Sequence, residues 1–470
     1  MSRGSTRLAA TALAAALVLT GCDSGDRRDP APMRRPVSSP AGEDTTIIGL
    51  VGTMTGPEAW RGEDAFEGAD LAVHELNRGG SDEREFELVT LDDEGDPGRA
   101  VDLVTELALS DRTAGIVYAG PPEALQSAEP ALEDAGIPAV LCYGDLYSAR
   151  LLEPNLFQVS PPYLWQARRL AAYLYRDRRY TRVGVLAPRT LSGRTARQSF
   201  AAAARRFGRR PVVATYELGA GSLRRQLLAL ARRDVHAVVV DGSPSQFATV
   251  QHELRVMGAT YRTTQIARRP SRRVWRPQLA GFDLAMSPRI VPDLMVPGTV
   301  VSDDYARGSH YLPIPSFRAF RRAFDDWWGE PPLGWERRAY EAARMIGWAT
   351  ARAATDESSI AAALETLRSR RFGGLGVVLG PDDHTSVNQP HVGLWVVPRP
   401  GVAVRERQDL PEELPWVPLA RGFSIDGETT DVAARDWRYL FRGSPSARGP
   451  APKNRRWRFG VATPRSDPVH

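Results

Sequence analysis

The residue patterns that support catalysis are incomplete in this sequence. His252 and Glu253 could begin a zinc-hydrolase motif, but no second histidine follows at the required spacing. A phosphate-binding loop with its lysine and a Gly-x-Ser-x-Gly nucleophile turn are both absent. His384, beside Asp382 and Asp383, could bind a metal, but it lacks companion ligands, and a structural role in a hairpin turn explains it better. We therefore expect no catalytic activity, no cofactor and no metal ion.

Cys22 is the residue whose surroundings predict a covalent modification. It follows an apolar run at residues 8–20 with a basic start at Arg3 and Arg7, which is the layout of a secretory signal. The run is too short for a transmembrane helix, which needs ~20 apolar residues. Residues 19–22, Leu-Thr-Gly-Cys, resemble the bacterial lipobox, which implies a signal peptide at 1–21 and lipidation of Cys22. We expect a lipid anchor on the extracytoplasmic face of the cell membrane; an ordinary cleaved signal with a chance cysteine is the alternative.

Composition indicates a globular protein of two domains. The 470 residues are 42% hydrophobic and 25% charged, which is ordinary for a chain that buries a sizeable core. No second long apolar run occurs, which argues against a membrane channel or transporter. The other cysteine is Cys142, so no intrachain disulfide is expected once Cys22 carries lipid.

The formal net charge of +5 does not predict nucleic acid binding. Lys453 is the only lysine, and such a bias toward arginine is typical of codon usage in a GC-rich genome. Pairs such as Arg205 and Arg206 fall on predicted helix faces, so solvated surfaces are expected. A separate arginine cluster at 268–276 could contact lipid headgroups or a partner, or be inert.

Most of the chain alternates short apolar runs with helices of ten or more residues, which predicts βαβ units and parallel sheets. Strands are predicted at 47–51, 86–91, 115–119, 138–141, 182–186, 212–217, 237–240 and 298–302. Helices are predicted at 66–78, 97–109 with Asp96 as N-cap, 123–134, 194–207, 223–232, 245–257, 316–328, 335–355 and 358–369. Two such series predict an α/β fold with two doubly wound parallel-sheet lobes. Residues 22–44 are expected to form a flexible tether, and 398–470 form an extension of unknown role.

Several short segments resemble one family in their order and spacing. The family is that of type I periplasmic substrate-binding proteins of the branched-chain amino acid class, and the resemblance covers about residues 45–397. The segments that carry it are 47–50 with 55–57, 68–77, 92–101, 135–138, 330–332, 339–342 and 372–374.

This resemblance implies two lobes joined by a hinge. The N-terminal lobe would comprise 45–160 plus about 290–370, and the C-terminal lobe 161–289 plus about 371–397. It also implies that the lobes close on a small ligand and deliver it to the permease subunits of an ABC transporter. In open α/β sheets a ligand lies beyond the carboxyl ends of the strands, and two facing lobes form a clamp there.

The positions that match the family's ligand site depart from its usual residues. Pro122 and Glu123 stand where a serine usually holds the ligand carboxylate, and Asp145 and Tyr147 stand where main-chain groups of an amino acid are bound. Asp283 could replace the acid that pairs with the ligand ammonium. The ligand-binding set implied by the resemblance is Trp60, Arg61, Pro122, Glu123, Tyr143, Gly144, Asp145, Tyr147, Ser192, Ser243 and Asp283.

These departures change the expected ligand. An anionic Asp145 would disfavour a carboxylate, so we expect a cationic, amide-like or otherwise polar solute, with Asp145 and Asp283 as its partners. Trp60, Tyr143 and Tyr147 would supply apolar faces. The alternative is an extracytoplasmic sensor or protein adaptor whose cleft is degenerate.

Overall fold

The computed structural model describes residues 45–56, 58–79, 85–265, 275, 277–285, 299–304, 315–332, 335–374, 376–387, 392–396 and 417–418. The expected signal peptide, Cys22 with its tether, the arginines between 268 and 276 and all of the C-terminal extension except 417–418 lie outside these residues. The named strands of the described part belong to two sheets, A and B. None of the described helices is both long enough and apolar enough to cross a bilayer.

Sheet A is a parallel sheet of five strands in the order β2-β1-β3-β4-β5. Its strands are rich in apolar residues and are mostly buried, except for the half-buried edge strand β2, as expected for a parallel sheet covered on both faces. The strands are β1 (Thr46–Gly52), β2 (Phe86–Asp92), β3 (Thr113–Ala119), β4 (Ala139–Leu141) and β5 (Leu156–Gln158).

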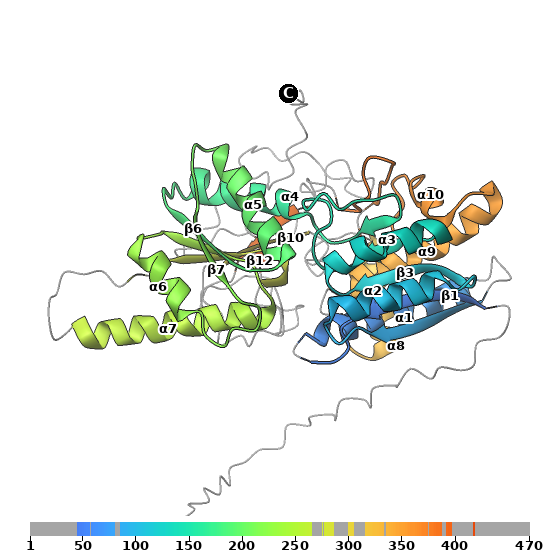
Figure 1. The fold of residues 1–470 in the computed structure, drawn as a ribbon, viewed down its shortest axis with the longest axis horizontal. Coiled ribbons are helices and arrows are strands. Elements are labelled where there is room, and N and C mark those ends of the chain that lie inside the picture. The colour runs from blue at the N-terminus through green and yellow to red at the C-terminus, as the bar shows by residue number, and fades with distance from the viewer. Residues whose placement is uncertain are drawn as a thin grey trace, which may run out of the picture. The chain divides into compact units, whose positions relative to one another are not determined.

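Helices cover both faces of sheet A because side chains alternate along its strands. Ile48 and Leu50 of β1 share a core with α1 (Trp60–Arg78) and α9 (Glu336–Asp356). Val51 shares a second core with α2 (Pro97–Ala108) and α3 (Pro122–Ala135). Figure 1 shows α1 and α9 running together along this sheet. Helices α8 (Pro315–Trp328) and α10 (Ile360–Leu364) join the first of these cores.

Sheet B has seven strands in the order β12-β11-β10-β9-β8-β6-β7. The pairs from β7 to β10 are parallel, and β11 and β12 are added antiparallel. The strands are β6 (Val183–Pro188), β7 (Val212–Tyr216), β8 (Ala237–Val240), β9 (Gln278–Gly281), β10 (Val300–Asp304), β11 (Val392–Val396) and β12 (Val417–Pro418). Helical segments packed with this sheet are α4 (Tyr163–Ala171), which continues as a π-helical turn at Ala172–Asp177, α5 (Leu191–Arg205), α6 (Arg224–Arg232) and α7 (Pro244–Gln265).

The predicted fold class, two doubly wound parallel-sheet α/β lobes, is confirmed. Asp96 accepts a hydrogen bond from the backbone N–H of Arg99 at 2.9 Å and caps α2 as predicted. The helix predicted at 358–369 is shorter: it ends at Leu364, because the following backbone pairs instead with residues 377–379. The lobe boundaries stay a prediction, and β10 of sheet B falls in the segment assigned to the N-terminal lobe.

Candidate functional site

The carboxyl ends of the parallel strands carry most of the predicted site residues. In sheet A, residues 143–145 follow β4, and Trp60 begins the helix after β1. In sheet B, Ser243 lies three residues after β8, and Asp283 lies two residues after β9. Because parallel strands end at the same edge of a sheet, these side chains gather at the edge where α/β proteins bind ligands.

Tyr163, the first residue of α4, connects three of the predicted positions. Its backbone N–H donates to Oδ2 of Asp145 at 2.5 Å, and its hydroxyl lies 2.9 Å from that of Ser192. Burial, followed by the negative charges of Asp241 and Asp283, raises the pKa of the Tyr163 hydroxyl well above its usual value. The structure therefore gathers Asp145, Ser192 and Asp283 around a residue that the sequence analysis did not select.

Both carboxylate oxygens of Asp145 accept backbone hydrogen bonds. Oδ1 accepts from the N–H of Ser148 at 2.8 Å, and Oδ2 accepts from the N–H of Tyr163. These bonds close the loop after β4 and satisfy the first N–H of α4, where a negative charge is favoured by the helix dipole. Burial nevertheless raises the pKa of Asp145 to about 6. Asp145 thus stabilises the loop, and its contact with a ligand stays a prediction.

Asp241 is a second buried carboxylate at this edge, and it was not predicted. Its side chain is 3% exposed. Burial raises its pKa to about 7, and the negative charge of Asp283 adds to this rise. A hydrogen bond from the Tyr163 hydroxyl and the positive charge of Arg61 oppose the rise. Arg61 belongs to the first turn of α1, a helix of sheet A. A cation from one sheet's helices therefore acts on an acid at the strand ends of the other sheet.

Trp60, Arg61 and Tyr143 form an aromatic and basic group beside these acids. The Trp60 ring centroid lies 5.6 Å from that of Tyr143 and 4.4 Å from that of Trp335. The Arg61 guanidinium carbon lies 5.4 Å from the Trp60 ring centroid, and its Nε lies 3.3 Å from Glu58. The Tyr143 hydroxyl is buried and makes no hydrogen bond to any described residue. These three predicted positions lie close together, and the rings of Trp60 and Tyr143 are buried.

Gly144, Pro122 and Glu123 lie at a close approach between two loops. Gly144 has a φ of +105°, and a Cβ there would lie 2.5 Å from Cγ of Pro122, so only glycine fits this position. Pro122 is buried at the start of α3, and Glu123 is half-buried in its first turn. The charge of Glu123 contributes, after burial and Asp93, to the raised pKa of Tyr118. This arrangement fixes the loop after β4 against α3.

The last two predicted positions have local partners. Ser243 caps α7: its N–H donates to Oε1 of Gln246 at 2.8 Å, and the N–H of Gln246 lies 3.5 Å from its hydroxyl. The Tyr147 ring centroid lies 5.3 Å from that of Trp165 on α4. Both residues therefore have structural contacts at the strand ends, and their contact with a ligand stays a prediction.

Asp283 belongs to a buried ionic group at the start of α9. The guanidinium of Arg338, which is 1% exposed, lies 2.9 Å from Asp283 and 2.9 Å from Asp303. Nε2 of Gln166 donates to the other oxygen of Asp283 at 3.0 Å. Burial and the attraction of the acids have opposite effects on Arg338, and the acids prevail, so its pKa is raised. Both oxygens of Asp283 are thus engaged by protein groups.

Arg337 extends this group toward β10 and along α9. It pairs with Asp304, at the end of β10, at 3.0 Å and with Glu341 one turn further along the helix. Burial raises the pKa of Glu341 to about 7, although the charge of Arg337 opposes the shift. Sheet B is therefore joined to a helix of sheet A through buried charges.

Two α/β units with polar groups at their strand ends match one known family. A family model described as periplasmic binding protein matches residues 45–397. The chain belongs to the periplasmic binding protein family. The resemblance to type I members seen in the sequence is thereby confirmed.

Solved structures agree in fold with this periplasmic binding protein. A leucine-binding protein from Thermotoga maritima is 16% identical and superposes with a TM-score of 0.62 over 76% of this chain and 96% of that chain. A branched-chain amino acid transporter substrate-binding protein from Streptococcus pneumoniae, in complex with isoleucine, is 18% identical, with a TM-score of 0.60 over 76% and 96%. A fatty acid ABC transporter substrate-binding protein from Thermomonospora curvata is 17% identical, with a TM-score of 0.63 over 76% and 89%. No curated protein matches the sequence.

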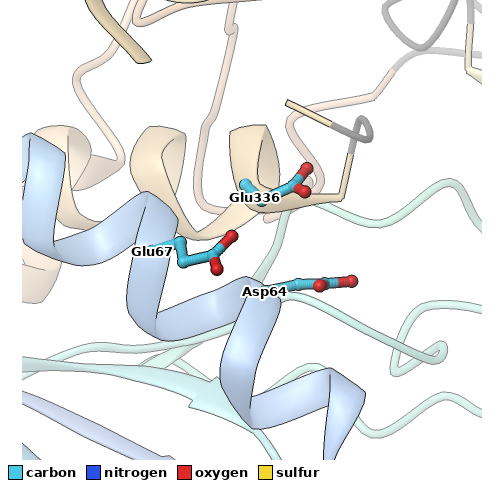
Figure 2. Close-up of side chains that lie close together, drawn as sticks. All are labelled: Asp64, Glu67 and Glu336. Atoms are coloured by element: carbon cyan, nitrogen blue, oxygen red, sulfur yellow. The ribbon is translucent and has the colours of Figure 1, made fainter. Parts of the chain in front are cut away.

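An acidic cluster lies where α1 meets α9 in this periplasmic binding protein. Figure 2 shows Asp64 and Glu67 of α1 beside Glu336 of α9, and one carboxylate oxygen from each residue lies within 4.8 Å of the other two. Oxygen ligands of this kind suit Ca²⁺ or Mg²⁺. Each of the three residues also has further interactions, so the cluster alone does not assign a cation.

Several residues of the site were not selected by the sequence analysis, and Asp241, Tyr163 and Arg338 illustrate why. Asp241 directly follows the predicted strand 237–240, and that position was a usable signal. Tyr163 follows two prolines, which favour a helix start and could have located α4. Arg338 gave no signal, because its partners are distant in the sequence and meet it only in the folded chain.

Proposed function

We propose that this periplasmic binding protein is an extracytoplasmic solute-binding lipoprotein, anchored through Cys22. It captures a small polar ligand, amino-acid-like, amide or amine, between its lobes and delivers it to an ABC permease. The ligand is bound and not chemically converted. Membership in a family of substrate-binding proteins supports this role, and leucine, isoleucine and fatty acids appear in the names of its structural neighbours.

The observation that supports the proposal most strongly is the placement of Arg61 at the start of α1 and of Asp241 at the end of β8, where the positive charge of Arg61 opposes the rise in the pKa of Asp241. The two residues belong to elements of different sheets, and both stand at strand ends. A carboxylate at position 241 can accept hydrogen bonds from an ammonium or amide group. Arg61 can donate to an anionic or carbonyl group on the same solute. Together they favour a ligand that carries both kinds of group.

Asp241 takes the role of ligand partner more readily than Asp283 in this proposal. Both oxygens of Asp283 are engaged by Gln166 and Arg338. A group that is already paired gains little from a ligand, whereas breaking a buried ion pair is costly. Asp283 then holds the site in place.

Thermal unfolding of the full chain with a panel of solutes tests this function. A ligand that binds only the folded state raises the unfolding temperature by mass action. We expect amino acids, amides or amines to raise it, and Asp241→Ala to abolish the shift. The exposed variant Asp102→Ala on α2 is the control and should retain the shift. No shift with any class would refute solute binding.

A second candidate function is an extracytoplasmic sensor or adaptor. The engagement of Asp145 and Asp283 by protein groups favours it, because it leaves fewer polar groups for a solute. Such a protein would show no thermal shift with small solutes but would bind a protein partner.

A further inference from the structure

Charge is divided unequally between the two sheets. Residues 45–160, which contain sheet A, include six arginines and 23 acidic residues, a formal net charge of −17. Residues 161–257, which contain β6 to β8, include 18 arginines and five acidic residues, a formal net charge of +13. Codon bias explains the use of arginine in place of lysine, but it does not explain opposite signs in adjacent parts of one chain.

The positive charge is concentrated on an exposed face at one edge of sheet B. We define this arginine face as Arg209 and Arg210, which precede edge strand β7, with Arg224, Arg225, Arg232 and Arg233 of α6 and its C-cap. All six are exposed, and none forms a salt bridge with a residue of the described chain. The acids nearest in sequence, Glu217 and Asp234, pair with arginines outside the face.

Helix α6 has two different sides. Leu227 and Leu230 are buried toward sheet B, with Leu223 before the helix. On the opposite side, Arg224, Leu228 and Arg232 form one row at i, i+4 spacing. A second row beside it consists of residues 225, 229 and 233. Figure 1 shows α6 with β7 at this edge of the sheet. Arginine and aliphatic side chains are thus mixed on one solvent-facing surface.

Exposed aliphatic side chains collect on the same edge. Of the six strongly exposed large hydrophobic residues of the described chain, three lie between 213 and 228. They are Val213, 47% exposed, Leu218, 61% exposed, and Leu228, 39% exposed. A purely solvated basic surface does not need them. Basic side chains interleaved with aliphatic ones are the composition that binds at a bilayer interface.

We propose that the arginine face binds the anionic headgroups of a phospholipid bilayer, with Val213, Leu218 and Leu228 entering the interfacial region. Charge complementarity supplies the attraction. The anionic bilayer surface repels the acidic segment 45–160. The opposite charges of the two segments therefore determine which part of the chain faces the membrane. A second copy of the chain would offer acidic groups, but of the six exposed hydrophobic residues only Leu109 lies in 45–160. A bilayer satisfies both the charged and the apolar components of the face.

Vesicle co-sedimentation of the full chain tests this inference. Every sample carries Cys22→Ser, which removes the site of acylation. Any contribution of the N-terminal segment to vesicle binding is then the same in all samples. The probes are vesicles of phosphatidylcholine alone and with about 30% phosphatidylglycerol, at ~20 mM and ~500 mM NaCl. The test variant is Arg224→Gln/Arg225→Gln/Arg232→Gln/Arg233→Gln, and the same four positions changed to Lys form the charge-matched control. Arg318→Gln/Arg322→Gln, on exposed positions of α8, removes charge elsewhere.

We expect binding that requires phosphatidylglycerol, weakens at high salt and falls by about tenfold or more in the Gln variant. The Lys variant and the α8 variant should bind like the parent. Equal binding of parent and Gln variant, or binding that is independent of phosphatidylglycerol, would overturn the proposal. So would salt-sensitive self-association in sedimentation equilibrium that the Gln variant abolishes without any lipid binding by the parent, because the face would then serve a second copy.

Discussion

At the scale of single residues, the site is distinguished by carboxyl groups whose pKa values are raised by burial. The pKa values of Asp145, Asp241 and Glu341 are raised to about 6, 7 and 7. Burial disfavours the charged form of each carboxyl, and the hydrogen bonds and cations around them only partly compensate. Proton uptake is therefore coupled to folding.

This coupling predicts the direction of the pH dependence of stability. For a carboxyl whose pKa rises from 3.8 to about 7, the folded state binds more protons than the unfolded state within that window. The free energy of unfolding therefore falls as pH rises through it. We expect Asp241→Asn to remove up to about 1.4 kcal/mol per pH unit of this slope and to be more stable than the parent at pH 8. Urea unfolding between pH 5 and pH 8 measures this, and parallel pH profiles for parent and variant would contradict it.

Asp145 permits a separate test of its structural contacts. Asp145→Ala removes the acceptor of two backbone N–H groups and should cost about 1–3 kcal/mol of unfolding free energy. The exposed Asp102→Ala serves as control and should change stability by less than about 0.5 kcal/mol. Equal stabilities in chemical denaturation would show that the two bonds contribute nothing.

At the scale of elements, α9 carries both a buried and an exposed ion pair. Arg338 lies between Asp283 and Asp303, and Arg352 pairs with Asp356 at 2.7 Å on the surface. Arg338→Met should cost about 3–5 kcal/mol, because buried carboxylates lose their cation. Arg352→Met should cost less than about 1 kcal/mol. Guanidinium unfolding compares the two, and similar costs would mean that the buried group is not ionised as described.

The crossing of α1 and α9 depends on a glycine. A Cβ on Gly68 would overlap the carbonyl oxygen of Glu336, whereas a Cβ on Gly79 finds its nearest atom at 3.4 Å. Gly68→Ala should therefore cost about 1–3 kcal/mol through forced separation of the helices. Gly79→Ala is the matched change at the end of the same helix and should be tolerated. A stable Gly68→Ala protein would show that the helices can separate at little cost.

Local signals explain which elements were predictable from the sequence. β1 consists of an apolar run, and α2 follows the N-cap Asp96 with Pro97 as its first residue. Both elements were therefore predicted from local sequence. Strand β9 (Gln278–Gly281) has only four residues and no long apolar run, so its own sequence gives little signal. It forms a strand because its backbone pairs with β8 on one side and β10 on the other. The site divides in the same way. Asp283 was selected through the resemblance to the family, whereas its partner Arg338 could be recognised only after the chain folds.

At the scale of the whole molecule, the central claim is that a small solute binds between two wound lobes and changes their separation. Cys142 is buried, and burial raises its thiol pKa to about 12, so it should not react with labelling reagents. Introduced cysteines can therefore be labelled selectively in a Cys22→Ser background. Asp102→Cys on α2 and Gln198→Cys on α5 place one exposed label on each sheet's helices.

Double electron–electron resonance between these two labels tests the claim most directly. Saturation with pooled amino acids, amides or amines should shift the distance distribution for at least one pool, and Asp241→Ala should abolish the shift. An identical distribution with every pool would contradict ligand-driven closure.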